Sequence, residues 1–280
     1  MLAGSIAARS VKDEKYDRIQ DAEFRVFSQF GEDGIIQYLI NKVEIENDTF
    51  VEIGVQDYSE SNTRFLLTNN NWSGAIFDVG TAHLSFLTRT QLRWRHTIDA
   101  YSIRITQENV NETLERVGMA GDIGLFSLDI DGNDYWIVKA LDAVSPRILV
   151  LEYNSIFGPH HAVTIPYRAN FNRTEAHYSN LYFGASLAAL YGLATAKGYR
   201  LVGSNSTGSN AFFVREDVAG SLPRLAPDEA YVKSRTREAR DHEGNNSYLA
   251  THEEGLRLVS ALPVVDLTAD RVITISEFGL

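Results

Sequence analysis

The sequence predicts an α/β fold, a doubly wound and mostly parallel sheet of the Rossmann-like kind that an antiparallel hairpin closes. Apolar segments of strand length alternate with segments of helical periodicity from residue 49 to residue 154. Two further strand-like segments, 200–205 and 210–217, follow each other closely and predict the hairpin. Because strand–helix–strand connections are right-handed, this alternation implies parallel strands with helices on both faces.

The first 48 residues are expected to form a helical extension. Residues 11–30 are charged and mixed, and we expect them to be helical. In the segment that follows, apolar side chains recur at helical spacing at Ile35, Ile36, Leu39, Ile40 and Val43. This spacing predicts a helix with one buried face.

The core of the fold is expected between residues 49 and 216. We predict strands at 49–55, 74–79, 96–103, 123–130 and 147–154, and helices at 62–72, 83–94, 108–118 and 135–144. A helix at 181–199, with a Gly-Tyr stop, precedes the hairpin.

Two segments interrupt or follow this alternation. Residues 155–178 are polar and aromatic, and an insertion of this length is uncommon in a compact domain unless it covers a site, so we expect a lid there. Residues 217–280 contain two apolar segments, 256–265 and 271–275, between charged stretches. We expect this C-terminal extension to pack on the core.

Composition limits the functions that the chain can have. Lys+Arg 26 against Asp+Glu 37 gives a net charge of −11 without a basic cluster, which argues against a nucleic-acid partner. The chain has no cysteine, so disulfides, thiolate metal sites and cysteine nucleophiles are excluded. The N-terminal apolar stretch is too short for a secretory signal and no run of about 18 apolar residues occurs. We expect a cytoplasmic protein without a membrane partner, and a homo-oligomer stays open.

Acidic residues follow nearly every predicted strand, at the carboxyl edge where ligands of such sheets bind. They are Glu52 with Gly54, Asp78, Asp99, Asp129, and Glu152 with Asn154. We expect Glu52, Gly54 and Asp78 to bind a nucleoside cofactor, with the backbone approaching at the glycine and Asp78 accepting ribose hydroxyls. Glu52 and Asp78 could instead cap helices, and Asp99 is as consistent with a turn as with an adenine contact.

The loop after the first strand indicates which cofactor fits. Its sequence, VEIGVQDYSES, lacks the G-x-G-x-x-G pattern and offers no glycine-rich turn for a pyrophosphate. This favours S-adenosylmethionine, which has no phosphates, over a dinucleotide.

Four segments together resemble the FkbM-type branch of class I S-adenosylmethionine-dependent methyltransferases. They are SQFGEDGII (28–36), FVEIGV (50–55), NNNWSGAIFDV (69–79) and SLDIDGNDYWIVKAL (127–141), in this order, within a match from about residue 24 to 215. The chain departs from the family at Asn71-Trp72, where Gly-Trp is usual, and at 55–57, where more glycine is common. The resemblance implies that Glu52, Gly54 and Asp78 contact the cofactor.

The same resemblance places Gln29, Glu32 and Asp33 near the cofactor pocket. The alternative for this segment is a helix cap, in which Ser28 precedes Glu32 by one residue more than the ideal capping box.

A metal site is a further expectation. Residues 129–131 and 152–154 end adjacent strands and resemble the aspartate site of Mg-dependent small-molecule O-methyltransferases, with Asp129, Glu152 and Asn154 as ligands and Tyr153 where an aspartate is usual. A hard cation there would lower the pKa of a substrate hydroxyl. The alternative is a turn at 131–134 that caps the helix beginning at Tyr135.

The lid supplies the remaining candidates. His160, His161 and His177 can each act as a general base near neutral pH, although loop histidines are more often surface residues. Aromatic residues of the lid, among them Phe171 and Tyr182, could stack on an acceptor, and the alternative is that they form the lid's own core. Asn205 and Asn210 are expected in turns.

These observations favour an S-adenosylmethionine-dependent methyltransferase that acts on a hydroxyl of a sugar or another polyhydroxylated small molecule, with Mg²⁺ as a candidate metal. Asp129 would be catalytic, together with the lid histidines. A non-catalytic scaffold that keeps the fold and the cofactor is the first alternative, because Tyr153 stands at a ligand position. A nucleotide-dependent oxidoreductase is the second, and it lacks the glycine fingerprint.

Overall fold

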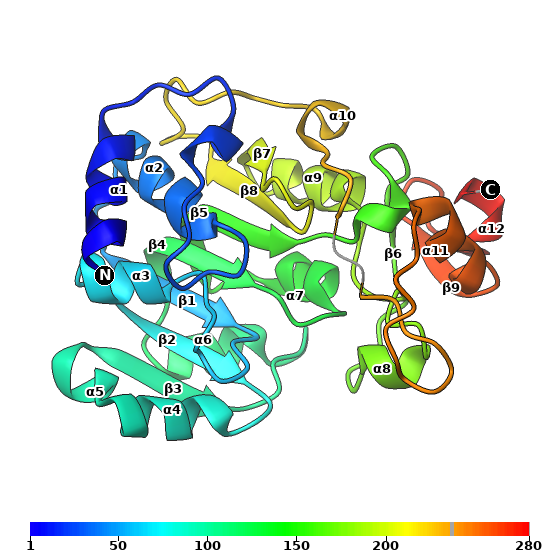
Figure 1. Ribbon diagram of the computed structural model, residues 1–280, viewed down its shortest axis with the longest axis horizontal. Helices are drawn as coiled ribbons and strands as arrows, with labels where there is room; N and C mark the ends of the chain where they lie inside the picture. The colour runs from blue at the N-terminus through cyan, green and yellow to red at the C-terminus, as the bar shows by residue number, and fades with distance from the viewer. Residues whose placement is uncertain (236–237, 280) are drawn as a thin grey trace.

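The predicted fold class is confirmed by a computed structural model, which describes residues 1–235 and 238–279 (Figure 1). Seven strands form one sheet in the order β3-β2-β1-β4-β5-β8-β7. Their bounds are β1 Thr49–Ile53, β2 Ser73–Asp78, β3 Ile98–Ser102, β4 Gly121–Leu128, β5 Val144–Glu152, β7 Tyr199–Ser204 and β8 Asn210–Arg215. β8 pairs antiparallel with both β5 and β7, so the closing hairpin is present as well.

Helices cover both faces of this sheet, each over its own apolar core. One core includes α1 (Leu2–Lys12), α2 (Glu32–Lys42), α3 (Arg64–Asn69), α4 (Ala82–Thr90) and α5 (Leu92–Arg95). The other includes α6 (Val110–Arg116), α7 (Asp134–Ala140), α9 (Leu187–Ala196) and α10 (Pro227–Ala230). In the part of the chain that the structure describes, every helix is too short or too polar to cross a membrane.

The prediction of a helix over residues 11–30 is wrong. α1 ends at Lys12, and the only regular element of the following segment is the short 3-10 helix η1 (Ile19–Ala22). The backbone N–H groups of 26–28 donate to one carboxylate oxygen of Asp33 at 2.7, 2.7 and 2.9 Å, and Ser28 Oγ accepts the N–H of Asp33 at 3.0 Å. Because a side chain takes these N–H groups, the segment forms a loop that reaches the carboxyl edge of the sheet.

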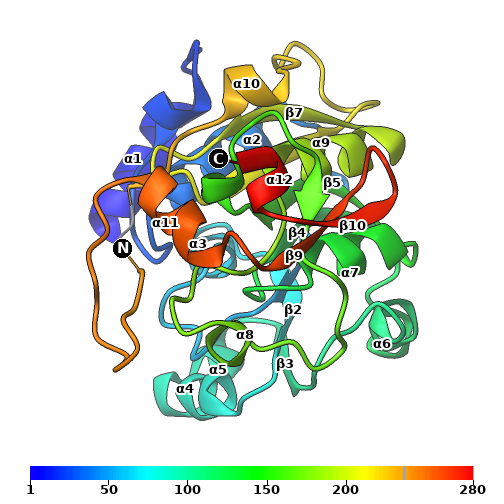
Figure 2. The ribbon, with the colours of Figure 1, turned by 90° about the vertical axis from the view of Figure 1, so that its right-hand side faces the viewer.

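The lid and the last part of the C-terminal extension form one unit, here called the roof (residues 155–185 and 252–278). A second sheet has the order β10-β9-β6, with β6 at Val163–Thr164, β9 at Pro263–Asp266 and β10 at Arg271–Thr274. Short helices complete it: η2 (Ser155–Phe157), α8 (Arg173–Ala176), α11 (His252–Val259) and α12 (Ser276–Gly279). Apolar side chains of both segments share one small core. The roof lies beyond the carboxyl ends of the main strands (Figures 1 and 2).

The C-terminal extension therefore packs in two places. Ala219, Leu222 and Ala230 are buried in the cores of the main sheet. The segment from α11 onward packs instead against the lid, where Val259 and Val264 are fully buried.

β1 and β4 approach each other closely where they end. The N–H of Gly54 donates to Phe77 O at 2.9 Å, and the N–H of Asp129 donates to Ile53 O at 3.0 Å. Gly54 has a φ of +90°, and a Cβ on it would lie 1.6 Å from the carbonyl oxygen of Asp129. Only glycine fits at this position.

Gly54→Ala should therefore lower the free energy of unfolding by at least about 3 kcal/mol, because strain at φ and a backbone clash add together. Urea denaturation measures it. Gly118→Ala is the matched control, since Gly118 has a φ of +76° with no atom within 4 Å of an added Cβ. That variant should lose only about 1 kcal/mol. Equal losses in both variants would contradict the close approach.

Candidate functional site

The strand alternation gathers polar side chains at one edge and on one face of the sheet. Phe50, Ile76, Leu125, Val150 and Phe212 belong to the core under α2 and α3. Because side chains alternate along a strand, the positions an even number of residues further toward this edge point to the same face. These positions are Glu52, Asp78, Asp129, Glu152 and Asn210.

Three cavities meet at Gln29 and Asp129. The strand-end cavity, about 250 Å³, is lined by Gly54, Asp78, Val79, Ile103, Ile105 and Phe171 among others. The lid cavity, about 390 Å³, is lined by residues that include Glu152, Phe183, Asn210, Glu238 and His252. A small cavity of about 130 Å³ is lined by Glu52 and the loop at 55–62. Gln29 and Asp129 line all three cavities, so a ligand in any one of them can contact these two residues.

At the end of β2, the strand-end cavity places apolar side chains next to the carboxylate of Asp78, which hydrogen bonds hold in place. Val79 is 54% exposed although it is apolar, and it lies beside Ile103 and Phe171. Asp78 accepts the backbone N–H of Gln56 and that of Gly80, each at 2.8 Å. Each carboxylate oxygen then keeps a lone pair for a ligand. This arrangement suits a flat apolar base with a hydroxylated sugar beside it.

Glu52 and Glu32, both expected to bind the cofactor, have structural partners. Glu52 is buried and accepts hydrogen bonds from the hydroxyl of Ser61, the backbone N–H of Asn62, and both the backbone N–H and the hydroxyl of Thr63. Burial raises its pKa. These contacts hold the loop after β1, which lines the small cavity with Glu52 itself.

Glu32 is fully buried and lines none of the three cavities. One of its oxygens accepts the side-chain amides of Asn205 and Asn210, at 2.7 and 2.9 Å. The other accepts the N–H of Phe30 at 2.9 Å. Glu32 therefore ties the closing hairpin to the loop that carries Gln29.

Three carboxylates lie together where the cavities join. One oxygen of each of Asp129, Asp131 and Glu152 lies within 4.8 Å of the others. Two unit charges about 5 Å apart repel by roughly 3 kcal/mol at an effective dielectric of about 20. Burial, and then repulsion from neighbouring carboxylates, raises the pKa of Asp129 and that of Glu152 well above the usual range. The pair therefore holds a proton more firmly than ordinary carboxylates do.

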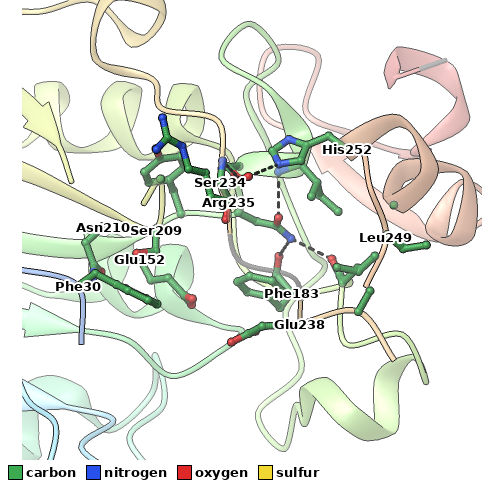
Figure 3. Close-up of a pocket in the computed structure, with 18 of the residues that line it drawn as sticks. Phe30, Glu152, Phe183, Ser209, Asn210, Ser234, Arg235, Glu238, Leu249 and His252 are labelled. Carbon is green, nitrogen blue, oxygen red and sulfur yellow. Dashed lines mark hydrogen bonds between the residues drawn. The ribbon is translucent and has the colours of Figure 1, made fainter. Parts of the chain in front are cut away.

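Arg173, on α8 of the roof, is the cation of this cluster. Its guanidinium forms ion pairs with Asp131 and, at 2.7 Å, with Glu238. Its Nε donates to Asn180 O, and its guanidinium carbon lies 3.9 Å from the centre of the Phe183 ring. Figure 3 shows Phe183 and Glu238 beneath the lid cavity, between Glu152 on one side and His252 on the other.

The expected metal ligands are only partly brought together. Asn154 Nδ2 donates to Leu181 O and Phe183 O, both at 3.0 Å, and its Oδ1 accepts the N–H of Ile156 at 3.2 Å. Its amide is thus committed to the backbone of the roof. Asp131 is near enough to replace it but is paired with Arg173. The three expected ligands therefore do not form the expected site, because Asn154 is not free to bind an ion and only Asp129 and Glu152 of that set are.

The lid histidines and Asp99 lie outside the three cavities. The ring centres of His161 and Phe278 lie 5.0 Å apart, and Nδ1 of His177 lies 2.7 Å from Ser179 Oγ. Asp99 is near the amino end of β3, where it pairs with Arg93 at 3.5 Å. The roles expected for His160, His161, His177 and Asp99 stay predictions, and the structure does not bring them to the carboxylates.

Sequence reasoning missed the residues that come from distant segments. Arg173, Glu238 and His252 line the cavities, yet nothing in their local sequence marks them. His252 Nε2 lies 3.2 Å from Ser234 O, and burial lowers its pKa. One signal in the sequence pointed to such residues. The acidic side chains predicted at the carboxyl edge outnumber the basic ones there, and buried charges are usually paired, so a cation from another segment was to be expected.

No protein-family model matches the sequence, and no curated protein matches it. Among solved structures, the N-terminal domain of EvdMO1 with SAH bound is 10% identical over 75% of this chain and 93% of that chain, with a TM-score of 0.43. A second structure of that domain, in the presence of SAH and D-fucose, is 9% identical with the same coverage and a TM-score of 0.40.

The mitomycin 7-O-methyltransferase MmcR is 15% identical over 76% of this chain, with a TM-score of 0.37. The chain spans about half of its length, 52%. The solved structures that the chain resembles thus include methyltransferases, at low identity.

Asp134 provides a test of the electrostatics at this edge. It is buried, and it accepts the N–H groups of Ile130 and Gly132 at 3.0 and 2.9 Å. Burial raises its pKa from 3.8 to about 6. Because the folded state binds this proton more tightly than the unfolded state, its contribution to stability is complete below about pH 4 and declines as the pH rises through 6.

The stability of the wild type relative to Asp134→Asn should therefore fall by on the order of 2 to 3 kcal/mol between pH 4 and pH 7. Free energies of unfolding at a series of pH values measure it. Parallel curves for the two proteins would show that the pKa of Asp134 is not raised.

Proposed function

We propose that this chain is an S-adenosylmethionine-dependent methyltransferase that methylates a hydroxyl of a sugar or another polyhydroxylated small molecule. One observation carries the proposal: a cavity suited to a nucleoside joins a second, polar cavity, and the junction is lined by carboxylates of raised pKa. Two reactants bound in these cavities would meet at Asp129.

The strand-end cavity supports S-adenosylmethionine over a dinucleotide. Its apolar walls and Asp78 fit an adenosine, and the close approach at Gly54 leaves backbone rather than side chain beneath the ligand. α3 begins at Arg64, ten residues after Gly54, so no helix N-terminus follows the strand directly to bind a pyrophosphate. The acidic cluster would repel phosphates and favours a cationic cofactor.

The carboxylates at the junction are suited to act as a general base. When bound, the cofactor supplies a methyl group on a sulfonium sulfur, which keeps the bonding electrons as the acceptor oxygen takes the methyl. The hydroxyl proton passes to the carboxylate pair of Asp129 and Glu152. An ionised carboxylate of raised pKa is a stronger base near neutral pH than an ordinary one. The roof lies over this edge of the sheet and would limit the access of water to a bound acceptor.

Two unpaired acceptors support a polyhydroxylated acceptor molecule. Glu152 Oε2 and Asn210 Oδ1 are buried without a hydrogen-bond partner among the described residues, and both residues line the lid cavity. They are opposite each other in the pairing of β5 with β8, so their side chains point to the same face. A buried acceptor without a donor is costly. Neighbouring hydroxyls of a sugar or polyol would supply two donors side by side.

Asp78→Ala should weaken the binding of SAH by about tenfold, because the loss of a hydrogen-bonding carboxylate costs roughly 1 to 2 kcal/mol. Isothermal titration calorimetry measures this, and NADH should give no binding heat. Asp99→Ala removes a carboxylate from the adjacent strand, outside the cavity, and should leave the affinity within about twofold. Binding of NADH without SAH would favour the oxidoreductase alternative instead.

Asn210→Ala should lower kcat/KM for the best acceptor in a panel of monosaccharides and polyols by about tenfold or more, with unchanged SAH affinity. Asn205→Ala is the matched control: Asn205 also donates to Glu32, but it lines none of the cavities and its Oδ1 is bonded to the N–H groups of 209 and 210. It should lower stability and leave kcat/KM near that of the wild type. If both variants lost activity in proportion to stability, Asn210 would be structural.

A further inference from the structure

Arg173 is unusual because one buried side chain joins three parts of the chain. Its side chain is 14% exposed, and it pairs with Asp131 after β4 and with Glu238 of the C-terminal extension. It also donates to the carbonyl of Asn180 within the lid. Arg173 and Glu238 line both the lid cavity and the strand-end cavity, so this cation sits where the two cavities join.

The guanidinium stands where the acidic cluster would otherwise need a metal. Asp129, Asp131 and Glu152 bring three oxygens within 4.8 Å, which is the kind of group that attracts a hard cation. Arg173 neutralises Asp131, and the amide of Asn154 is committed to backbone groups. A divalent ion such as Mg²⁺ completes its oxygen ligands with water, so the charge left on the cluster, rather than its number of oxygens, decides whether the ion binds. The ion would also have to displace an arginine that three other groups, Glu238, the carbonyl of Asn180 and the ring of Phe183, hold in place.

We propose that Arg173 is the resident counter-cation of this carboxylate cluster and positions Asp131 and the lid, so that the native site takes no divalent ion. An arginine keeps its charge at every pH at which the protein is folded. The positive charge that compensates the cluster therefore does not vary with pH. It is present only while the roof, which carries Arg173, lies over the cluster. This inference concerns the cluster itself, and its test does not require that methyl transfer be confirmed.

The test is a titration with Mn²⁺ followed by electron paramagnetic resonance, on the full chain. The wild type should show no Mn²⁺ bound at the cluster. Arg173→Met removes the charge and keeps the apolar stem, so it should bind Mn²⁺ roughly tenfold or more tightly than the wild type. Adding Asp131→Asn to this variant should abolish the gain, because one of the three carboxylates is lost.

Two controls separate charge from folding. Arg168→Met makes the same charge change in the same lid segment, at a residue that lines neither of the two large cavities, and it should gain no Mn²⁺ site. Arg173→Lys keeps a cation and should gain none either. Circular dichroism and thermal melting report whether each variant is folded.

A wild type that binds Mn²⁺ and loses it on Asp131→Asn would overturn the proposal. A folded Arg173→Met that gains no more than Arg168→Met would overturn it too. If Arg173→Met does not fold, the wild type and Arg173→Lys decide: absence of Mn²⁺ at the cluster in both supports the proposal, and an Asp131-dependent site in either contradicts it.

Discussion

The concentration of negative charge at one edge of one sheet is the constraint on which the rest of this structure depends. Parallel strands end at the same edge, and their alternation turns the last side chains toward one face. Backbone N–H groups, hydroxyls or an arginine compensate four of the carboxylates near this edge: Glu52, Asp78, Asp131 and Asp134. Asp129 and Glu152 keep strongly raised pKa values, so this pair is the candidate for acid–base chemistry at the site.

This compensation also explains why segments far from the core are needed. The loop before α2 places Gln29 at the junction because Asp33 holds its backbone. The closing hairpin supplies Asn210, held by Glu32, and the roof supplies Arg173. The core provides the acids, and these additions provide the groups that orient or neutralise them.

The fold was predictable because it follows from local patterns. Each strand of the core is a short apolar segment, and each intervening helix has an apolar face, so the parallel strands and the closing hairpin follow from few rules. Residues 11–30 were wrongly expected to be helical because their pattern does not reveal that the N–H groups of 26–28 bond to Asp33. The Asp33 carboxylate accepts N–H groups that a helix would bond to backbone carbonyls.

The candidate site was predictable only where it belongs to strand ends. Gly54, Asp78, Asp129 and Glu152 line cavities, since their position in the sequence determines their position at the edge. Arg173, Glu238 and His252 come from segments that reach the edge only through packing of the roof. Lid histidines drew attention by their chemistry, yet apolar packing directs His161 toward Phe278 rather than toward the acids.

The pairing of β6 with β9 has a consequence for how the protein is made. The main sheet is complete once Arg215 has left the ribosome, whereas Val163 and Thr164 must wait about 100 residues for their partners Asp266 and Val265. Domains fold from the N-terminus as synthesis proceeds. The acidic edge can thus form before the C-terminal half of its cover has been synthesised.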